Sequence, residues 1–200
     1  MECYKFKGKD GKYSFNNLKQ EGKIFWFIVI GSIPAAVIGL LLKKLTEPIR
    51  ENVIVIGIAL AFMGILLYIV DKKCKKEVNM ENLTLKQAVL IGASQVLAAL
   101  IPGFSRSGTT ILAGRLLGLS KEAIAKFTFL LSTPIIFGAF IMNVGDLVFT
   151  KEVIIGIVTS FVIGILSIKF LLNYIKKHDF SIFAFYRVII SLLVLIKLIF

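Results

Sequence analysis

The chain has 200 residues, of which 57% are hydrophobic and only 18% are charged. In soluble globular domains, about 45–50% of residues are hydrophobic and about 25% are charged. Lysine and arginine outnumber aspartate and glutamate by 24 to 12, a net charge of +12. The hydrophobicity excludes a disordered chain, and two cysteines are too few for a disulfide scaffold. A basic nucleic-acid-binding protein does not need several long apolar runs. The composition therefore indicates a polytopic membrane protein in a lipid bilayer, with no nucleic-acid partner.

Five apolar runs are long enough to cross a bilayer: residues 24–42, 53–70, 127–149, 153–175 and 182–200. About 18–20 helical residues extend about 27–30 Å, close to the thickness of the hydrocarbon core. A single segment in lipid satisfies its backbone hydrogen bonds only as a helix. The sequence thus predicts an all-α protein, with a membrane domain over residues 24–200. Residues 1–23 are charged and have no signal-peptide core, so they are expected to form a cytoplasmic loop or tail.

The segment at about 87–119 differs from these runs. Polar and turn-forming residues interrupt it, and Arg115 lies inside its short second apolar part. It either crosses the membrane once as a kinked helix or turns back as a re-entrant helix pair. Turning back collects more of the loop lysines and arginines on one face, which the positive-inside rule favours. We therefore predict five transmembrane helices plus one re-entrant helix pair, with residues 1–23 on the cytoplasmic side of an inner membrane.

Residues 102–110 read Pro-Gly-Phe-Ser-Arg-Ser-Gly-Thr-Thr. They combine a guanidinium, four hydroxyls and two glycines without a carboxylate, which is the composition of an anion site. Arg106 can donate two hydrogen bonds to a phosphate, and Gly103 and Gly108 allow close approach of the backbone. A helix beginning near Ser107 would direct its free N–H groups at the same anion. The alternatives are a snorkelling arginine, a plain turn, and helix capping by Ser105 and Ser107, which is compatible with anion binding.

The other polar residues are weaker candidates. Arg115 either pairs with the anion site or faces the cytoplasmic interface, and Gln95 either lines the cavity or bonds a neighbouring helix. His178 lies in a lysine-rich loop and is expected to be solvated. One histidine and two loop cysteines cannot assemble a transition-metal site, so no residue is predicted as a metal ligand. The residues therefore predict an intramembrane anion site suited to a phosphorylated lipid, without an obvious general base.

Residues 101–111, Ile-Pro-Gly-Phe-Ser-Arg-Ser-Gly-Thr-Thr-Ile, resemble the second signature of the bacterial undecaprenyl-diphosphatase family, also called the bacitracin-resistance family. Further similar segments follow the family order, at residues 31–40, 87–95, 127–134 and 183–187. The resemblance extends over essentially the whole chain from Glu21 onward.

This resemblance implies an inverted-repeat fold with two re-entrant helix pairs, of which the chain would hold a remnant. It implies hydrolysis of undecaprenyl diphosphate to the monophosphate and inorganic phosphate, which recycles the carrier lipid for peptidoglycan and gives bacitracin resistance. It also implies substrate binding by Ser105, Arg106, Ser107, Gly108 and Thr109, with Arg106 as the catalytic residue. The family uses a divalent cation, magnesium or calcium.

The family's first signature, with acidic residues, a serine pair and a histidine, has no match here. The resemblance therefore implies an N-terminally truncated member that lacks the general base and the metal ligands, and predicts impaired hydrolysis. A polyprenyl-phosphate transporter or flippase without hydrolysis is the alternative function. A membrane scaffold would explain the helices but not the hydroxyls around Arg106. The sequence leaves open the preferred prenyl length and whether the protein forms a homo-oligomer.

Overall fold

The computed structural model describes residues 20–42, 52–74, 77–146 and 150–199. Within these ranges the secondary structure is helical, which confirms the predicted all-α class. Four of the described helices are long and apolar enough to cross a membrane: α1 (Gln20–Leu41), α3 (Val53–Lys73), α6 (Lys121–Asn143) and α7 (Lys151–Lys177). A fifth apolar helix, α8 (Ser181–Ile199), occupies the last predicted run. The chain is therefore a polytopic membrane protein.

Two helices begin at least four residues before the predicted runs. Helix α1 begins at Gln20, so it includes residues 20–23 of the predicted tail, while residues 1–19 lie outside the described ranges. Helix α6 begins at Lys121, earlier than the predicted start at residue 127, because Ser120 caps it. The Ser120 hydroxyl accepts a hydrogen bond from the Ala123 N–H at 3.2 Å. Helix α6 ends at Asn143 and is followed by the short η4 (Val144–Asp146).

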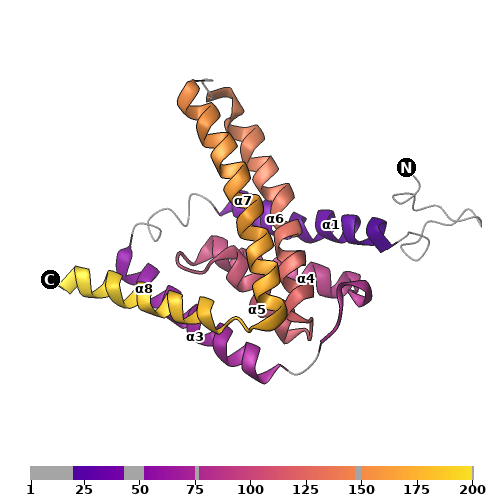
Figure 1. Cartoon of the computed structure of the whole chain (residues 1–200), viewed down its shortest axis with the longest axis horizontal. Coiled ribbons are helices and arrows are strands. Elements are labelled where there is room, and N and C mark those ends of the chain that lie inside the picture. Colours follow the sequence, from indigo (N-terminus) through magenta and orange to yellow (C-terminus); the bar gives the residue numbers. More distant parts are fainter. Residues whose placement is uncertain (1–19, 43–51, 75–76, 147–149, 200) are drawn as a thin grey trace, which may run out of the picture.

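The helices pack in pairs around the short helix α5 (Arg106–Leu116). Figure 1 shows α3 lying along α8, and α7 beside α6, with both reaching away from the other helices. Helix α1 packs along α4 (Leu85–Leu100), while α5 contacts α3, α4 and α6. The main buried apolar cluster gathers where these helices meet, and includes Ile91, Ile124, Phe127 and Leu131. This packing surrounds α5 with three longer helices, α3, α4 and α6.

Helices α4 and α5 form the helix pair predicted around residues 87–119, and they pack on each other. A capping box of Thr84 and Gln87 begins α4, just after the short η3 (Met80–Asn82). The turn between the two helices contains Gly103 at φ +92°, a conformation that side chains rarely adopt. Insertion of this helix pair into a membrane stays a prediction.

Helices α1 and α4 approach each other through glycines. A Cβ atom on Gly92 would lie only 1.9 Å from the carbonyl oxygen of Gly31, so any side chain there would collide with the backbone. Small residues at such contacts are typical of helix packing in membranes, where close approach of backbones replaces the hydrophobic driving force. The contact fixes α4, and hence the helix pair, against α1.

A buried ion pair joins α3 to α5. The Nε of Arg115 donates to Oδ1 of Asp71 at 2.9 Å, and the two side chains are only 1% and 2% exposed. Arg115 also donates to the carbonyl oxygens of Leu119 at 2.6 Å and Cys74 at 3.0 Å. Oδ2 of Asp71 accepts from the Phe180 N–H just before α8. Arg115 therefore pairs with Asp71 and not with the anion site, and through Asp71 the ion pair also reaches the residue before α8.

An exposed ion pair near this corner makes stability depend on acid pH. Lys72 donates to the Asp179 carboxylate at 2.5 Å, and this bond, supported by Ser181, lowers the pKa of Asp179 from 3.8 to about 2. A depressed folded-state pKa gives stability that is present above the unfolded pKa and is lost as the pH falls toward the folded one. We expect the unfolding temperature of the wild type to fall more steeply between about pH 4 and about pH 2 than that of Asp179→Asn.

Thermal unfolding across this pH range checks the expectation, with Glu81→Gln, an exposed acid in η3, as the control. Parallel profiles for the wild type and Asp179→Asn would contradict it.

Candidate functional site

The first turn of α5 is capped by Ser105. Its hydroxyl accepts from the Gly108 N–H at 3.2 Å and shares a hydrogen bond of 2.9 Å with the Ser107 hydroxyl. The backbone N–H of Thr109 bonds the Ser105 carbonyl. The N–H groups of Arg106 and Ser107 have no acceptor within the helix, as is usual in a first turn. They carry the positive end of the helix dipole, which favours an anion at this position.

A cavity of about 510 Å³ lies beside this helix start. It is bounded by residues of α3, α5, α6, α7 and α8. Its polar lining comes from Ser107, Gly108, Thr128, Ser132 and Arg187, together with Tyr186. The other lining residues are apolar, and they include Leu67, Ile111, Phe129, Leu171 and Phe183. The cavity therefore joins a small polar region to a larger apolar one.

Arg187 of α8 is the feature of this cavity that the sequence did not reveal. Its Nη1 is buried and has no hydrogen-bond partner among the described residues. The guanidinium faces Gly108, since a Cβ atom on that glycine would lie 2.7 Å from Nη1. A buried donor without an acceptor is costly, so an anion in the cavity beside Arg187 would satisfy it. The sequence did contain one sign of this role: Arg187 lies inside an apolar run, and a charged residue in such a run is a functional candidate in a membrane protein.

The structure divides the predicted site residues into three groups. Ser107 and Gly108 line the cavity. Ser105 acts as the helix cap, and the buried Thr109 donates its hydroxyl to the Arg106 carbonyl at 2.9 Å. The Arg106 side chain is exposed at the start of α5, next to the cavity but not among its lining residues. Arg106 and Thr109 therefore have no described contact with the cavity.

Gln95 and His178 lie apart from this cavity. Gln95 is 2% exposed on α4, and its Nε2 has no hydrogen-bond partner in the described part of the chain. His178 is exposed at the end of α7, where its ring stacks on Tyr174 with a centroid distance of 4.3 Å. Neither residue lines the 510 Å³ cavity.

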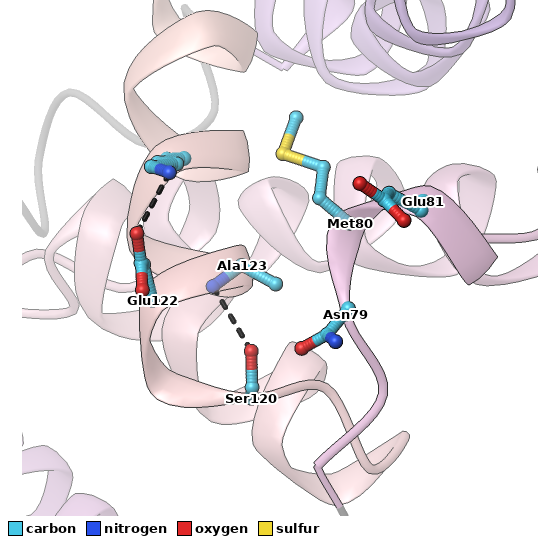
Figure 2. A pocket seen from close by; sticks show the side chains of 7 residues that line it. Asn79, Met80, Glu81, Ser120, Glu122 and Ala123 are labelled. Carbon is cyan, nitrogen blue, oxygen red and sulfur yellow. Dashed lines mark hydrogen bonds and ion pairs between the residues drawn. The ribbon is translucent and has the colours of Figure 1, made fainter. Parts of the chain in front are cut away.

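Figure 2 shows a second, smaller cavity of about 290 Å³ where η3 meets the start of α6. Asn79 and Glu81 lie on one side of it, and Ser120 and Glu122 on the other. Glu122 is paired with Lys126 at 2.7 Å, and Ser120 is occupied as the cap of α6. Because these contacts belong to the helix start itself, this cavity is explained by local structure.

The described residues do not form a site for a divalent cation. No group of three or more histidine, cysteine, aspartate or glutamate side chains gathers within the described ranges. The lining of the 510 Å³ cavity offers hydroxyls and a guanidinium but no carboxylate among the residues described. Magnesium and calcium prefer carboxylate and carbonyl oxygens, and a nearby arginine repels them. The cavity fits an anion and not a metal ion.

These apolar helices form a membrane protein with a cavity that combines a helix N-terminus, a partly buried guanidinium and apolar walls. The family model of the bacitracin resistance protein BacA matches residues 5–193, and the chain belongs to this family. The resemblance seen in the sequence is thereby confirmed.

Curated relatives with the name undecaprenyl-diphosphatase are similar over most of the chain. The protein of Caldicellulosiruptor bescii is 43% identical, over 88% of this chain and 68% of the relative. The protein of Pelotomaculum thermopropionicum is 41% identical, over 88% of this chain and 67% of the relative. The protein of Enterococcus faecalis is 40% identical, over 86% of this chain and 67% of the relative. By name these relatives are phosphatases, so the chain is a member of an enzyme family.

Proposed function

We propose that this protein hydrolyses undecaprenyl diphosphate to undecaprenyl phosphate and inorganic phosphate. The names of its relatives support this activity. The observation that carries the proposal is the meeting of Ser107, Gly108 and Arg187 in a cavity whose other walls are apolar. A diphosphate head joined to an isoprenoid chain needs these two environments side by side.

Hydrolysis of a diphosphate mainly requires positive charge that stabilises the phosphate oxygens. Water adds to the terminal phosphorus, the bond from that phosphorus to the bridging oxygen breaks, and undecaprenyl phosphate leaves with the electron pair. Positioned donors that stabilise the charge on the transferred group and the leaving oxygen supply most of the catalysis of such reactions. In this proposal Arg187 and the N–H groups of Arg106 and Ser107 bind the diphosphate, and the exposed Arg106 side chain closes over it.

Proton transfer needs further groups. The described residues that line the cavity include no carboxylate and no imidazole. We therefore propose that the general base, and the ligands of the magnesium or calcium ion that the resemblance implies, lie outside these residues. Because no segment of the sequence resembles the family's first signature, we propose that hydrolysis by the 200-residue chain alone is slow.

Phosphate release from undecaprenyl diphosphate tests the activity. The purified chain is assayed alone and after co-expression with the part of the Caldicellulosiruptor bescii relative that the match does not cover. We expect rapid release only in the second case. Arg106→Ala should lower it by at least about 100-fold, as for other groups that stabilise a transition-state charge. The control is Lys86→Ala, an exposed cation on α4.

No phosphate release from the co-expressed proteins, or an unchanged rate for Arg106→Ala, would overturn the proposal. Passage of labelled polyprenyl phosphate across a liposome membrane without phosphate release would instead favour a transporter.

We also propose a cytoplasmic-membrane location with a role in recycling the carrier lipid for peptidoglycan. The excess of loop lysines and arginines supports an inner-membrane protein, since such residues remain on the cytoplasmic side. The name of the family, a bacitracin resistance protein, supports a connection with the cell wall.

A further inference from the structure

A chain of buried hydroxyl groups links α6 to the first turn of α5. The Thr128 hydroxyl donates to Oγ1 of Thr110 at 3.0 Å. Oγ1 of Thr110 lies 3.1 Å from the carbonyl oxygen of Arg106 and 3.0 Å from that of Ser107. Both threonines are buried, at 4% and 1% exposed. Since a hydroxyl has one proton, Thr110 donates to the first-turn carbonyls while it accepts from Thr128. The chain therefore runs in one direction, from α6 to α5.

The Thr128 hydroxyl donates to another helix, unlike the hydroxyls of Ser132 and Thr133 on the same helix α6. A serine or threonine inside a helix commonly donates to a carbonyl in the preceding turn. Ser132 donates in this way to the Thr128 carbonyl at 2.9 Å, and Thr133 to the Phe129 carbonyl at 3.4 Å. Thr128 instead bonds across to α5. Its hydroxyl thus contributes to the packing between two helices and not to the local geometry of α6.

The turn held by this chain is the one that meets the cavity. Ser105 caps it through Gly108, and Gly108 faces the Arg187 guanidinium on α8. Thr128 itself is also a wall of the cavity. A shift of the first turn of α5 would change the distance between its free N–H groups and Arg187, which are the two sources of positive charge in the site.

We propose that Thr128 is a positioning residue, which acts through Thr110 to hold the first turn of α5 at the distance from Arg187 that a prenyl diphosphate requires. The part of this inference that concerns the ligand rests on the proposed function. The part that concerns the position of α5 does not.

Three variants of the full chain test the inference. Thr128→Val keeps the shape and removes the hydroxyl, Thr128→Ser keeps the hydroxyl, and Thr133→Val removes a hydroxyl that bonds only within α6. Binding of farnesyl diphosphate and of uncharged farnesol is measured in detergent by calorimetry. We expect Thr128→Val to bind the diphosphate about tenfold more weakly, the scale of one buried hydrogen bond. Its affinity for farnesol, and both affinities of the other two variants, should be unchanged.

Amide hydrogen exchange over residues 108–111, the first amides of α5 with hydrogen-bond acceptors, is measured without ligand and separates positioning from direct contact with the diphosphate. We expect exchange there to be about tenfold faster in Thr128→Val, because local opening no longer breaks the hydroxyl chain. Thr128→Ser and Thr133→Val should exchange like the wild type. Unchanged exchange in Thr128→Val would overturn the inference, as would an equal loss of affinity for farnesol and for the diphosphate. A wild type that binds no prenyl diphosphate would contradict the proposed function, while the exchange data would still decide the role of Thr128.

Discussion

Replacing Arg187 with methionine should strongly weaken binding of a prenyl diphosphate while leaving the protein at least as stable as the wild type. The Nη1 of Arg187 is buried without a partner among the described residues, so the folded protein bears an uncompensated polar group. Methionine fills a similar volume without that cost. Hydrogen bonds to charged groups contribute about 1.5–3 kcal/mol, so the affinity should fall by about 10–150-fold.

Calorimetry with farnesyl diphosphate and thermal unfolding in the same detergent measure the two effects. Lys197→Met is the matched control, because it removes an exposed cation from the same helix and should change neither quantity. A lower unfolding temperature with unchanged affinity would mean that Arg187 supports the fold and does not bind the anion.

Replacing Arg115 with methionine should have the opposite profile, with a large loss of stability. It would leave the carboxylate of Asp71 buried at 2% exposure without its ion pair. Breaking one partner of a buried pair costs about 3–5 kcal/mol. For a chain of this size each kcal/mol shifts the unfolding temperature by about 2–4 °C, so we expect a decrease of about 6–20 °C.

The double variant Asp71→Asn with Arg115→Met should recover part of this loss, since it removes the stranded charge. Glu122→Gln, which breaks the exposed pair with Lys126, is the control and should cost less than about 1 kcal/mol. If Arg115→Met were no more harmful than this control, or if the double variant were less stable than Arg115→Met, the buried pair would not be a main support of the fold.

These two arginines show what the sequence alone could not predict. Each is an isolated cation in an apolar segment, so hydropathy cannot distinguish them. Arg115 finds a carboxylate 44 residues away in the sequence, while Arg187 faces the bare backbone of Gly108 on another helix. Such long-range contacts depend on how the helices pack, which no local pattern encodes.

Local features were predicted well. Two helices flank the turn at residues 101–105, and Ser105 caps the second of them. The turn and the cap could be predicted because each depends on residues within a few positions in the sequence. Ser107 and Gly108 line the cavity, and their binding of substrate stays a prediction. The Arg106 side chain is exposed instead, and its contact with substrate stays a prediction. The beginning of α6 was missed because Ser120 was not recognised as its cap.

The length of α7 has a consequence for the depth of the cavity. Its 27 residues extend about 40 Å, more than the roughly 30 Å of hydrocarbon, so its charged ends stand among the lipid headgroups. Leu171, on the wall of the cavity, comes only five residues before Lys176. This separation is about 7.5 Å along the axis. On the α7 side, we therefore expect the wall of the cavity to lie just beneath one headgroup layer, so that a phosphorylated lipid would enter from that leaflet while its hydrocarbon tail stays in the bilayer.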